Sequence, residues 1–299
     1  MLGAFVSEAG VSDVFVNPDG TVWCDRGGGA ERAEGIRIPA GEARDLAVRL
    51  IALGGRHVDE ATPCVDVRLG AGVRVHVVLP PVATGGPAIS IRVQRERPIS
   101  FEELIADSFF VEVAADRVRE LVRRRANLLI TGAGGSGKTT LLGALLATAP
   151  AGERIVVLED VAELQIAHPH VVSLEARQAN LDGAGALGLD RLVREALRMR
   201  PDRLVVGECR GAEVRELLAA LNTGHDGGAG TLHANSLADV PARLEALGAL
   251  AGLSTDALAR QAISAFEAVL HVERTASGRR LAALGRLELD RRGRLAVAA

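Results

Sequence analysis

One short glycine-rich segment constrains the fold more than any other part of the chain. It runs Gly132-Ala133-Gly134-Gly135-Ser136-Gly137-Lys138-Thr139 and matches the pattern G-x-x-x-x-G-K-[ST] at every specified position. An apolar stretch, 127–131, precedes it, and a helical pattern over 138–148 follows it. The segment therefore predicts a strand, a loop whose backbone amides turn onto phosphates, and a helix whose positive N-terminal end faces the same phosphates.

Lys138 is the only lysine among the 35 lysines and arginines of the chain. A compact ammonium fits between two phosphates, whereas the larger planar guanidinium of arginine does not. We therefore expect a site for a nucleoside triphosphate, with the Thr139 hydroxyl on Mg²⁺. The alternative, a glycine-rich turn that matches by chance, is disfavoured because strand, loop and helix agree. The residues expected around the nucleotide phosphates are Gly132, Gly134, Gly135, Ser136, Gly137, Lys138, Thr139 and Thr140.

Composition limits the remaining classes. The 299 residues are 48% hydrophobic and 2% aromatic, with a net charge of −3, so no basic field indicates direct nucleic-acid binding. The three cysteines are scattered and form no C-x-x-C pair, which argues against a zinc site or a disulfide framework. Residues 1–16 do not resemble a signal peptide, and no apolar run reaches the ~18 residues of a membrane span. We expect a cytoplasmic protein that reaches a membrane only through partners.

Hydrophobic periodicity predicts two domains, 1–98 and 99–299. In the first, a helix candidate follows Gly41 with Leu46, Leu50 and Leu53 on one face. The charged residues 95–97 and Pro98 form the expected linker. The strands expected there are 14–16, 21–23, 64–69, 73–77 and 89–93.

From about residue 101, helices alternate with short buried strands, a rhythm that predicts an α/β domain with a doubly wound, mainly parallel sheet. The helices expected there are 116–125, 138–148, 189–197, one after 212, 238–247 and 255–268. The strands are 127–131, 155–158, 204–206, one near 231 and a terminal β segment at 269–297.

Two expected strands end in carboxylates, Glu159-Asp160 and Glu208. Ligands of an open parallel sheet bind beyond the carboxyl ends of the strands, so both should face the phosphates. Glu208 is a candidate to hold Mg²⁺ through water or to orient the attacking water, and Glu159 and Glu163 are candidates to activate it. Capping of a following helix is the competing interpretation, and it stays open for Asp160.

Two histidines, His225 and His233, flank a segment that has too much glycine for a core strand. Downstream of a strand that ends in a carboxylate, they are better interpreted as sensors of the γ-phosphate than as surface histidines. Zinc binding is the competing idea, but neither a cysteine nor a third histidine accompanies them.

These segments resemble the type II/IV secretion ATPase superfamily, closest to the tight-adherence (Flp) pilus assembly and conjugal-transfer-associated ATPases. Residues 134–140 resemble the family's Walker A motif, and residues 158–164 resemble its Asp box. Residues 200–211 resemble its Walker B motif, and residues 223–235 resemble its His box. The resemblance implies a PAS-like α+β domain followed by a RecA-like P-loop NTPase domain, with ATP between them. The paired C-x-x-C zinc module of the type II and type IVa pilus motors is missing.

The resemblance also implies a Mg²⁺-dependent ATPase that acts as a homo-hexamer on inner-membrane platform proteins of a pilus or secretion system. Arg74 and Arg92 match arginines that reach the phosphates from the N-terminal domain, and strand alternation places both on polar faces; the alternative is a solvated strand arginine. Two further functions remain open. One is a conjugation-associated or DNA-translocating motor, and the other is a non-catalytic scaffold, against which Glu159, Glu208 and His233 argue.

Overall fold

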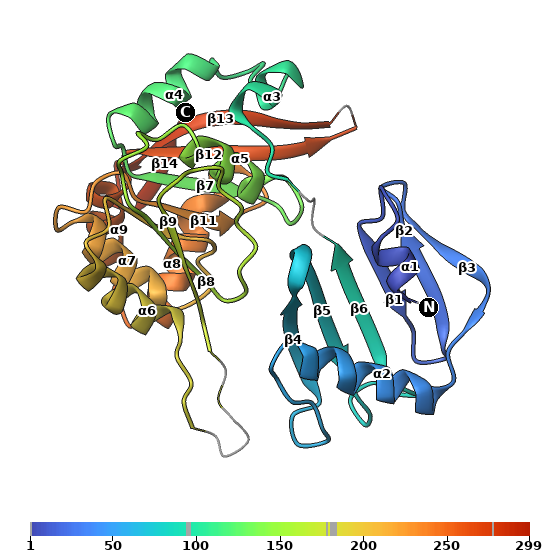
Figure 1. Cartoon of the computed structure of the whole chain (residues 1–299). Helices are drawn as coiled ribbons and strands as arrows, with labels where there is room; N and C mark the ends of the chain where they lie inside the picture. Colours follow the sequence, from blue (N-terminus) through green and yellow to red (C-terminus); the bar gives the residue numbers. More distant parts are fainter. Residues whose placement is uncertain (1, 94–96, 178, 180–183, 277) are drawn as a thin grey trace. The chain divides into compact units, whose positions relative to one another are not determined.

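The computed structural model describes residues 2–93, 97–177, 179, 184–276 and 278–299. It divides the chain into two compact units, Met1–Arg97 and Pro98–Ala299 (Figure 1). Residues 95 and 96 of the expected linker lie outside the described residues.

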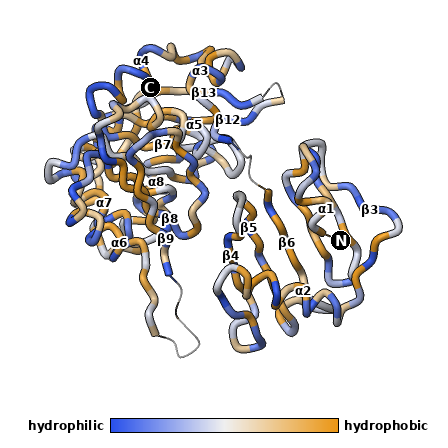
Figure 2. Tube along the Cα trace, viewed as in Figure 1, coloured by the Kyte–Doolittle hydropathy of each residue, from blue (hydrophilic) through white to orange (hydrophobic). Residues whose placement is uncertain are grey.

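The first unit is a six-stranded antiparallel sheet with the strand order β3-β2-β1-β6-β5-β4. The expected hairpin at 64–77 is confirmed, with a 3-10 turn at Gly70–Gly72 between its strands. The apolar strand residues appear as separate orange stretches in Figure 2. The elements are α1 (Leu2–Val6), β1 (Asp13–Val16), β2 (Thr21–Asp25), β3 (Ala30–Arg37), α2 (Ala40–Leu53), β4 (Cys64–Leu69), β5 (Val73–Val78) and β6 (Ala88–Val93).

Of the three leucines expected on one face of α2, Leu46 and Leu50 are partly buried against the core of the first unit. The buried residues are Ala43, Ala47 and Ile51, whereas Leu53 is 76% exposed. The helix packs on β4 and β5, and its small alanines allow the backbone to approach the sheet closely. Gly54, just after the helix, continues this contact, because a Cβ there would lie 2.4 Å from Cβ of Val67.

The second unit is an α/β domain with a mixed eight-stranded sheet in the order β14-β13-β12-β7-β11-β10-β8-β9. The six strands from β12 to β9 are parallel, and β13 and β14 extend them antiparallel. The helices are α3 (Phe101–Ala106), α4 (Ala115–Arg123), α5 (Lys138–Leu146), α6 (Leu189–Ala196), α7 (Glu213–Leu221), α8 (Val240–Leu250) and α9 (Thr255–Ala265). The strands are β7 (Leu128–Gly132), β8 (Ile155–Glu159), β9 (Val171–Glu175), β10 (Arg203–Val206), β11 (Ala229–His233), β12 (Ala268–Thr275), β13 (Gly278–Leu289) and β14 (Leu295–Ala298).

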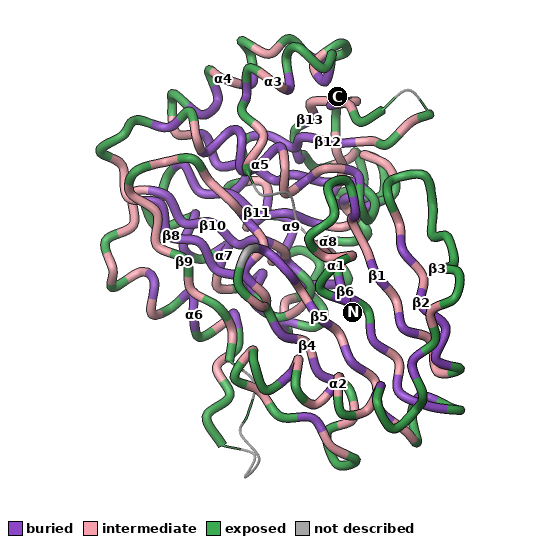
Figure 3. Tube along the Cα trace, turned by 45° about the vertical axis from the view of Figure 1, so that its right-hand side comes forward, coloured by how far each residue is buried: buried purple, intermediate pink, exposed green. Residues whose placement is uncertain are grey.

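Helices cover both faces of this sheet. Residues of α3, α4 and α5 form one core with one face, and residues of α6 to α9 form a second core with the other. Strand β10 shows the alternation, because Val205 belongs to the first core while Leu204 and Val206 belong to the second. The central strands are therefore buried on both sides, as the purple segments of Figure 3 show.

The short strand expected near Thr231 is confirmed, but the interpretation that the segment between His225 and His233 has too much glycine for a core strand is wrong. Ala229–His233 forms β11 between β7 and β10, and its first four residues are buried. A Cβ on Gly230 would lie 3.1 Å from Cδ2 of Leu217 in α7. Glycine is therefore tolerated here because it lets a helix pack closely on the strand.

Candidate nucleotide site

The carboxyl ends of four parallel strands, β7, β11, β10 and β8, meet at one edge of the sheet. Gly132 at the end of β7 pairs with His233 at the end of β11, and Val206 of β10 pairs with Leu158 of β8. This register brings the segments after each strand to the same edge. The expected site residues gathered there are Lys138, Thr139, Thr140, Glu159, Glu163, Glu208 and His233.

The loop between β7 and α5 has backbone angles that glycine favours. Gly135 and Gly137 have φ of 69° and 107°. At Gly132 a Cβ would lie 2.2 Å from the carbonyl oxygen of Val272, so only glycine fits there. Ser136 is 1% exposed, and its Oγ has no hydrogen-bond partner among the described residues. A buried hydroxyl without a partner, in a loop at a helix N-terminus, fits an anionic ligand.

Lys138 is 6% exposed, and its ammonium points back onto the loop. Nζ donates to the carbonyl oxygens of Gly132, at 3.0 Å, and Ala133, at 2.9 Å. Burial lowers the pKa of Lys138, while the nearby Glu208 carboxylate opposes that change. Both of these hydrogen bonds go to neutral carbonyls, so an anion that approaches the buried ammonium stabilises it.

The carboxylate of Glu208 contacts one histidine side chain and one arginine side chain. Its Oε1 lies 2.6 Å from Nε2 of His233, and its Oε2 accepts a hydrogen bond of 2.5 Å from Arg210. Burial and then the charge of Lys138 lower the pKa of His233, and Glu208 opposes them. The imidazole is thus neutral at pH 7 and donates its Nε2–H to the carboxylate. Sequence reasoning gave Arg210 no role, although its place two residues after a strand-end carboxylate was a usable signal.

Glu159 is buried, and its carboxylate organises the loop after β8. Oε1 accepts hydrogen bonds from the backbone amides of Glu163, at 3.1 Å, and Leu164, at 2.9 Å. Its Cγ lies 2.5 Å from the position that a Cβ on Gly207 would take, so the side chain crosses the end of β10. The half-buried Glu163 is one of the acidic groups that raise the pKa of Arg210, after Glu208 and Asp160. Glu159 and Glu163 therefore lie at the same edge as Glu208.

The capping interpretation of the strand-end acids is wrong. Among the described residues, no helix follows β8 before α6 begins at Leu189, so Asp160 does not cap one. Ala212 occupies the cap position of α7, four residues after Glu208. Glu213 instead accepts hydrogen bonds from the amides of Arg210 and Gly211, which stabilises the turn between Glu208 and the helix.

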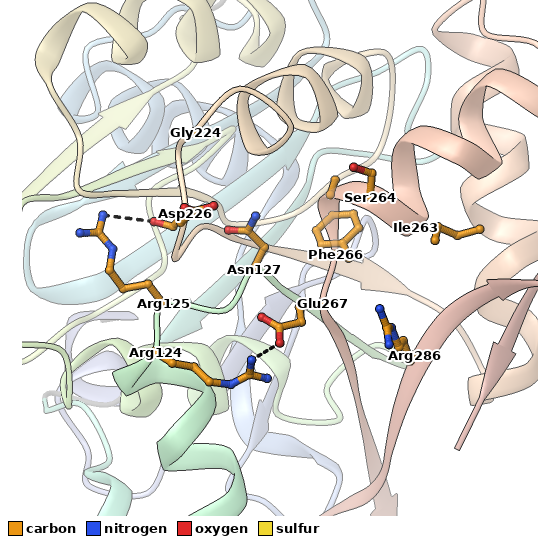
Figure 4. A pocket seen from close by; sticks show the side chains of 11 residues that line it. Arg124, Arg125, Asn127, Gly224, Asp226, Ile263, Ser264, Phe266, Glu267 and Arg286 are labelled. Carbon is orange, nitrogen blue, oxygen red and sulfur yellow. Dashed lines mark hydrogen bonds and ion pairs between the residues drawn. The ribbon is translucent and has the colours of Figure 1, made fainter.

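The structure separates His225 from the other expected site residues. His225 precedes β11 and so lies at the amino ends of the parallel strands, where its Nδ1 is 3.2 Å from the carbonyl oxygen of Ala220. Its neighbours Gly224 and Asp226 line an open polar pocket of about 620 Å³ with Arg125 and Asn127 (Figure 4). The whole of β11 lies between His225 and His233, which rules out a zinc ion shared by the two and a common contact with one phosphate.

In the first unit, Arg74 of β5 lies directly opposite Arg92 of β6, on the polar face of the sheet. Nη2 of Arg74 lies 3.3 Å from Oδ1 of Asp66, and Nε of Arg92 lies 3.1 Å from Oδ1 of Asp13. Arg68 of β4 faces Arg74 from the other side and extends the row to three arginines. Like charges directly opposite each other destabilise a sheet, and the carboxylates of Asp66 and Asp13 offset part of that repulsion.

Oxygen donors for a magnesium ion are few. Within the part of the chain that the structure describes, no group of three or more His, Cys, Asp and Glu residues is placed to hold a metal. The Thr139 hydroxyl and the Glu208 carboxylate are nevertheless the hard oxygen donors that Mg²⁺ prefers. Mg²⁺ typically takes one or two protein ligands and completes its shell with water and phosphate oxygens, so these two residues fit that cofactor.

Comparison with known proteins decides the family. Residues 4–274 match the model of the type II/IV secretion system protein family. This chain belongs to that family. The chain is 49% identical over 286 residues to a putative conjugal transfer protein of Mycobacterium tuberculosis, covering 94% of this chain and 81% of that protein. It is 34% identical over 282 residues to conjugal transfer protein TrbB of Rhizobium radiobacter, covering 92% and 83%.

A solved structure shares the fold of this chain. It is the ATPase DotB of Legionella pneumophila, with a TM-score of 0.64 and 19% identity, covering 99% of this chain and 77% of that one. Among the described residues of the family member, no helix is both long and apolar enough to cross a membrane.

Proposed function

We propose that this family member is a Mg²⁺-dependent ATPase, the motor that powers pilus assembly or protein secretion at an inner-membrane platform. The observation that carries the proposal is the grouping of Lys138, Glu208 and His233 at one edge of a parallel sheet. A buried ammonium, a carboxylate and a neutral imidazole lie there beside a loop that fits phosphates. Membership of the secretion family supports the coupling of this chemistry to transport.

Each residue then has a distinct part in hydrolysis. Lys138 exchanges its bonds to two loop carbonyls for bonds to the terminal phosphates. Glu208, positioned by Arg210 and His233, orients the attacking water, and Glu159 and Glu163 assist in its activation. His233 reports the presence of the γ-phosphate through its bond to Glu208. Bound Mg²⁺ would neutralise phosphate charge, with Thr139 and Glu208 as its protein-side oxygen ligands.

The two units then correspond to a PAS-like domain, 1–98, and a RecA-like P-loop domain, 99–299, in a cytoplasmic homo-hexamer. Arg74 and Arg92 contribute delocalised positive charge to the phosphates from the first domain. Their placement opposite each other on β5 and β6 supports this role, because a bound anion relieves the repulsion between them. Opening and closing of the domains in the ATP cycle moves the membrane partners.

Replacement of the single lysine tests the function. Lys138→Ala is expected to lose ATP turnover by a factor of at least about 10² and to bind ADP weakly, because the charge on the terminal phosphates is then uncompensated. Phosphate release and ADP titration measure the two effects, and circular dichroism verifies the fold. Arg291→Ala removes an exposed cation elsewhere in the same unit and serves as the control. Unchanged hydrolysis in Lys138→Ala would disprove the assignment.

A conjugation-associated motor is the second candidate, because two of the relatives that match most of this chain bear conjugal transfer names. ATPase rates with and without single- and double-stranded DNA distinguish the two candidates. A protein-secretion or pilus motor is expected to show no response to DNA, in keeping with the net charge of −3. A several-fold stimulation that disappears with rising salt would favour the DNA-linked function.

A further inference from the structure

The edge of the second unit's sheet that lies opposite the nucleotide site carries a pocket of its own. Strands β7, β11 and β12 are parallel, and Leu128 at the start of β7 pairs with Ala229 of β11 and Ala268 of β12. The amino ends of the three strands therefore meet at one edge. The pocket there has a volume of about 620 Å³, within the ~300–1,000 Å³ of typical ligand sites. Its charged and amide side chains are Arg124, Arg125, Asn127, Asp226, Glu267 and Arg286.

Asn127 is the central and most firmly held of these side chains. It is 8% exposed, and its Oδ1 accepts a hydrogen bond of 2.9 Å from the backbone amide of Gly228. Its carbonyl oxygen accepts a bond of 3.0 Å from the amide of Glu267, so the residue is tied to the chain just before β11 and just before β12. Because Oδ1 is the acceptor, Nδ2 is a donor, and it has no hydrogen-bond partner among the described residues. Figure 4 shows Asn127 in the middle of the lining residues, so this nearly buried donor suits a ligand that offers an oxygen.

Arg286 of β13 supplies a cation without a carboxylate partner. Its side chain is exposed, and within the part of the chain that the structure describes it forms neither an ion pair nor a hydrogen bond. The other arginines of the pocket are engaged. Arg124 forms an ion pair with Glu267, and Arg125 donates to backbone carbonyls that include that of Asp226, at 3.3 Å. The positive charge that is available to a ligand is therefore that of Arg286.

The pocket has a cationic side and an anionic side. Figure 4 shows Arg286 and Asp226 on opposite sides of Asn127. The carboxylate of Asp226 is exposed and, like Arg286, has no ion-pair partner among the residues described. A dense polyanion such as a nucleic acid would be repelled by Asp226 and by Glu267. A peptide, in contrast, presents acidic side chains to a cation and backbone N–H groups to a carboxylate.

We propose that this pocket binds an acidic segment of a partner protein. A carboxylate of that segment binds Arg286, an oxygen of the segment accepts from Nδ2 of Asn127, and a backbone N–H donates to Asp226. The pocket lies at the edge opposite the phosphate loop and shares no residue with the group formed by Lys138 and Glu208. The proposal therefore does not depend on the ATPase function, and it gives the second unit separate edges for nucleotide and for a protein partner.

Fluorescence anisotropy with two labelled peptides of equal length, a Glu-Gly repeat and a Gln-Gly repeat, tests the proposal. The Glu-Gly peptide is expected to bind the wild-type chain at low salt and to dissociate as the ionic strength rises, and the Gln-Gly peptide to bind at least about tenfold more weakly. Arg286→Gln is expected to weaken the Glu-Gly complex about five- to tenfold, because charge-assisted hydrogen bonds are lost. Arg291→Ala removes an exposed arginine in the turn after β13 and, as the control, is expected to bind the peptide as the wild type does.

Asn127→Asp tests the donor at the centre of the pocket. The substitution retains Oδ1 as the acceptor for the Gly228 amide but replaces the Nδ2 donor by an anion, so binding of the Glu-Gly peptide is expected to fall at least about tenfold. Circular dichroism verifies the fold of each variant. The ADP Kd of Arg286→Gln should equal that of the wild type, which separates this proposal from the proposed function. Equal affinity of the wild type for the two peptides, or equal affinity of wild type and Arg286→Gln for the Glu-Gly peptide, would overturn the proposal. Displacement of the Glu-Gly peptide by a lower concentration of single-stranded DNA would overturn it in favour of a nucleic-acid site.

Discussion

His233 and Glu208 lie 2.6 Å apart, Nε2 to Oε1, at and just beyond the carboxyl ends of two neighbouring parallel strands. The parallel arrangement of β10 and β11 creates this proximity, because it delivers the two chain segments to the same edge. Arg210 binds the other oxygen of Glu208, so the carboxylate is held from two directions. A carboxylate oriented in this way is suited to position one water molecule beside a phosphate.

Replacing Glu208 by glutamine tests that role. Glu208→Gln retains the size of the side chain but removes its charge and most of its basicity. We expect kcat for ATP to fall by about 10²–10³-fold, because a positioned proton acceptor is lost. The Kd for ADP should stay within about threefold, since Lys138 and the loop still hold the phosphates.

Phosphate release and fluorescence titration with a labelled ADP measure these two constants. Glu288→Gln, in an exposed position of β13, is the matched control and is expected to retain wild-type turnover. Equal turnover in Glu208→Gln and Glu288→Gln would show that Glu208 takes no part in hydrolysis.

The buried side chain of His271 is expected to make the stability of the second unit depend on pH. The side chain is 1% exposed; its Nδ1 lies 2.9 Å from Oγ1 of Thr131, and its Nε2 has no hydrogen-bond partner among the described residues. Burial lowers the pKa of His271; Glu273 and Asp239 oppose this, and Lys138 adds to it. The folded state therefore favours the neutral ring. This contribution is complete above the unfolded pKa of about 6.5 and is lost as the pH falls toward the lower folded value.

Thermal unfolding between pH 8 and pH 5 tests this prediction. His271→Asn retains a polar atom near Thr131 but does not titrate, so its Tm should fall less steeply below pH 6.5 than that of the wild type. His57→Asn, at an exposed position of the first unit, should keep the wild-type slope in the transition of the second unit. Parallel Tm profiles for His271→Asn and the wild type would contradict the assignment.

Local sequence signals predicted most of the second unit, including a terminal β segment that covers β13 and most of β14, but not the edge strand β9. Strands β7, β8 and β10 were expected because each is a short apolar run buried on both faces, with helices around it. Strand β9 was missed because it is a half-exposed edge strand without a continuous apolar run. Helix α3 was missed although Ser100 and Glu103 form a capping box, a pattern that can be read directly from the sequence.

Site residues were predictable where the motif spacing determines their position, and not where long-range packing does. Lys138, Glu208 and His233 meet because each ends or follows a strand of one parallel sheet. His225 was misplaced because a glycine-rich segment was taken for a flexible loop, whereas Gly230 lets β11 pack against α7. The hydrogen bond from Arg279 to the carbonyl oxygen of Gly135 could not be predicted from sequence, because it joins residues 144 positions apart.

The buried cation Arg203 is expected to contribute strongly to the stability of the second unit. It is 2% exposed, donates from Nε to Glu153 at 2.5 Å and from Nη2 to the carbonyl oxygen of Val122 at 2.9 Å. Arg203→Ala removes the nearest cation from the largely buried carboxylate of Glu153, which keeps only the longer 3.9 Å ion pair to Arg125 among the described residues. The change is expected to lower the free energy of unfolding by about 3–5 kcal/mol. Urea denaturation monitored by circular dichroism measures the change.

An exposed ion pair of one arginine and one glutamate provides the comparison for Arg203. Arg198 and Glu195 form an i,i+3 pair on the helical surface at 3.0 Å. Arg198→Ala is expected to lower the free energy of unfolding by no more than about 0.5 kcal/mol, because water solvates both partners. Similar losses in Arg198→Ala and Arg203→Ala would show that burial of the Arg203–Glu153 pair does not determine how much the pair stabilises the fold.

A methyl group added at Gly132, at the start of the phosphate loop, is expected to destabilise the protein. Its φ is 151°, and a Cβ would lie 2.2 Å from the carbonyl oxygen of Val272 and 2.6 Å from Oγ of Ser136. Backbone atoms cannot move aside as a flexible side chain can, so β7 and β12 must separate. Gly132→Ala is expected to lower the free energy of unfolding by on the order of 3 kcal/mol and to weaken ADP binding. Gly152→Ala, with nothing within 4 Å of its Cβ position, should leave both unchanged, and equal stability of the two variants would refute the steric argument.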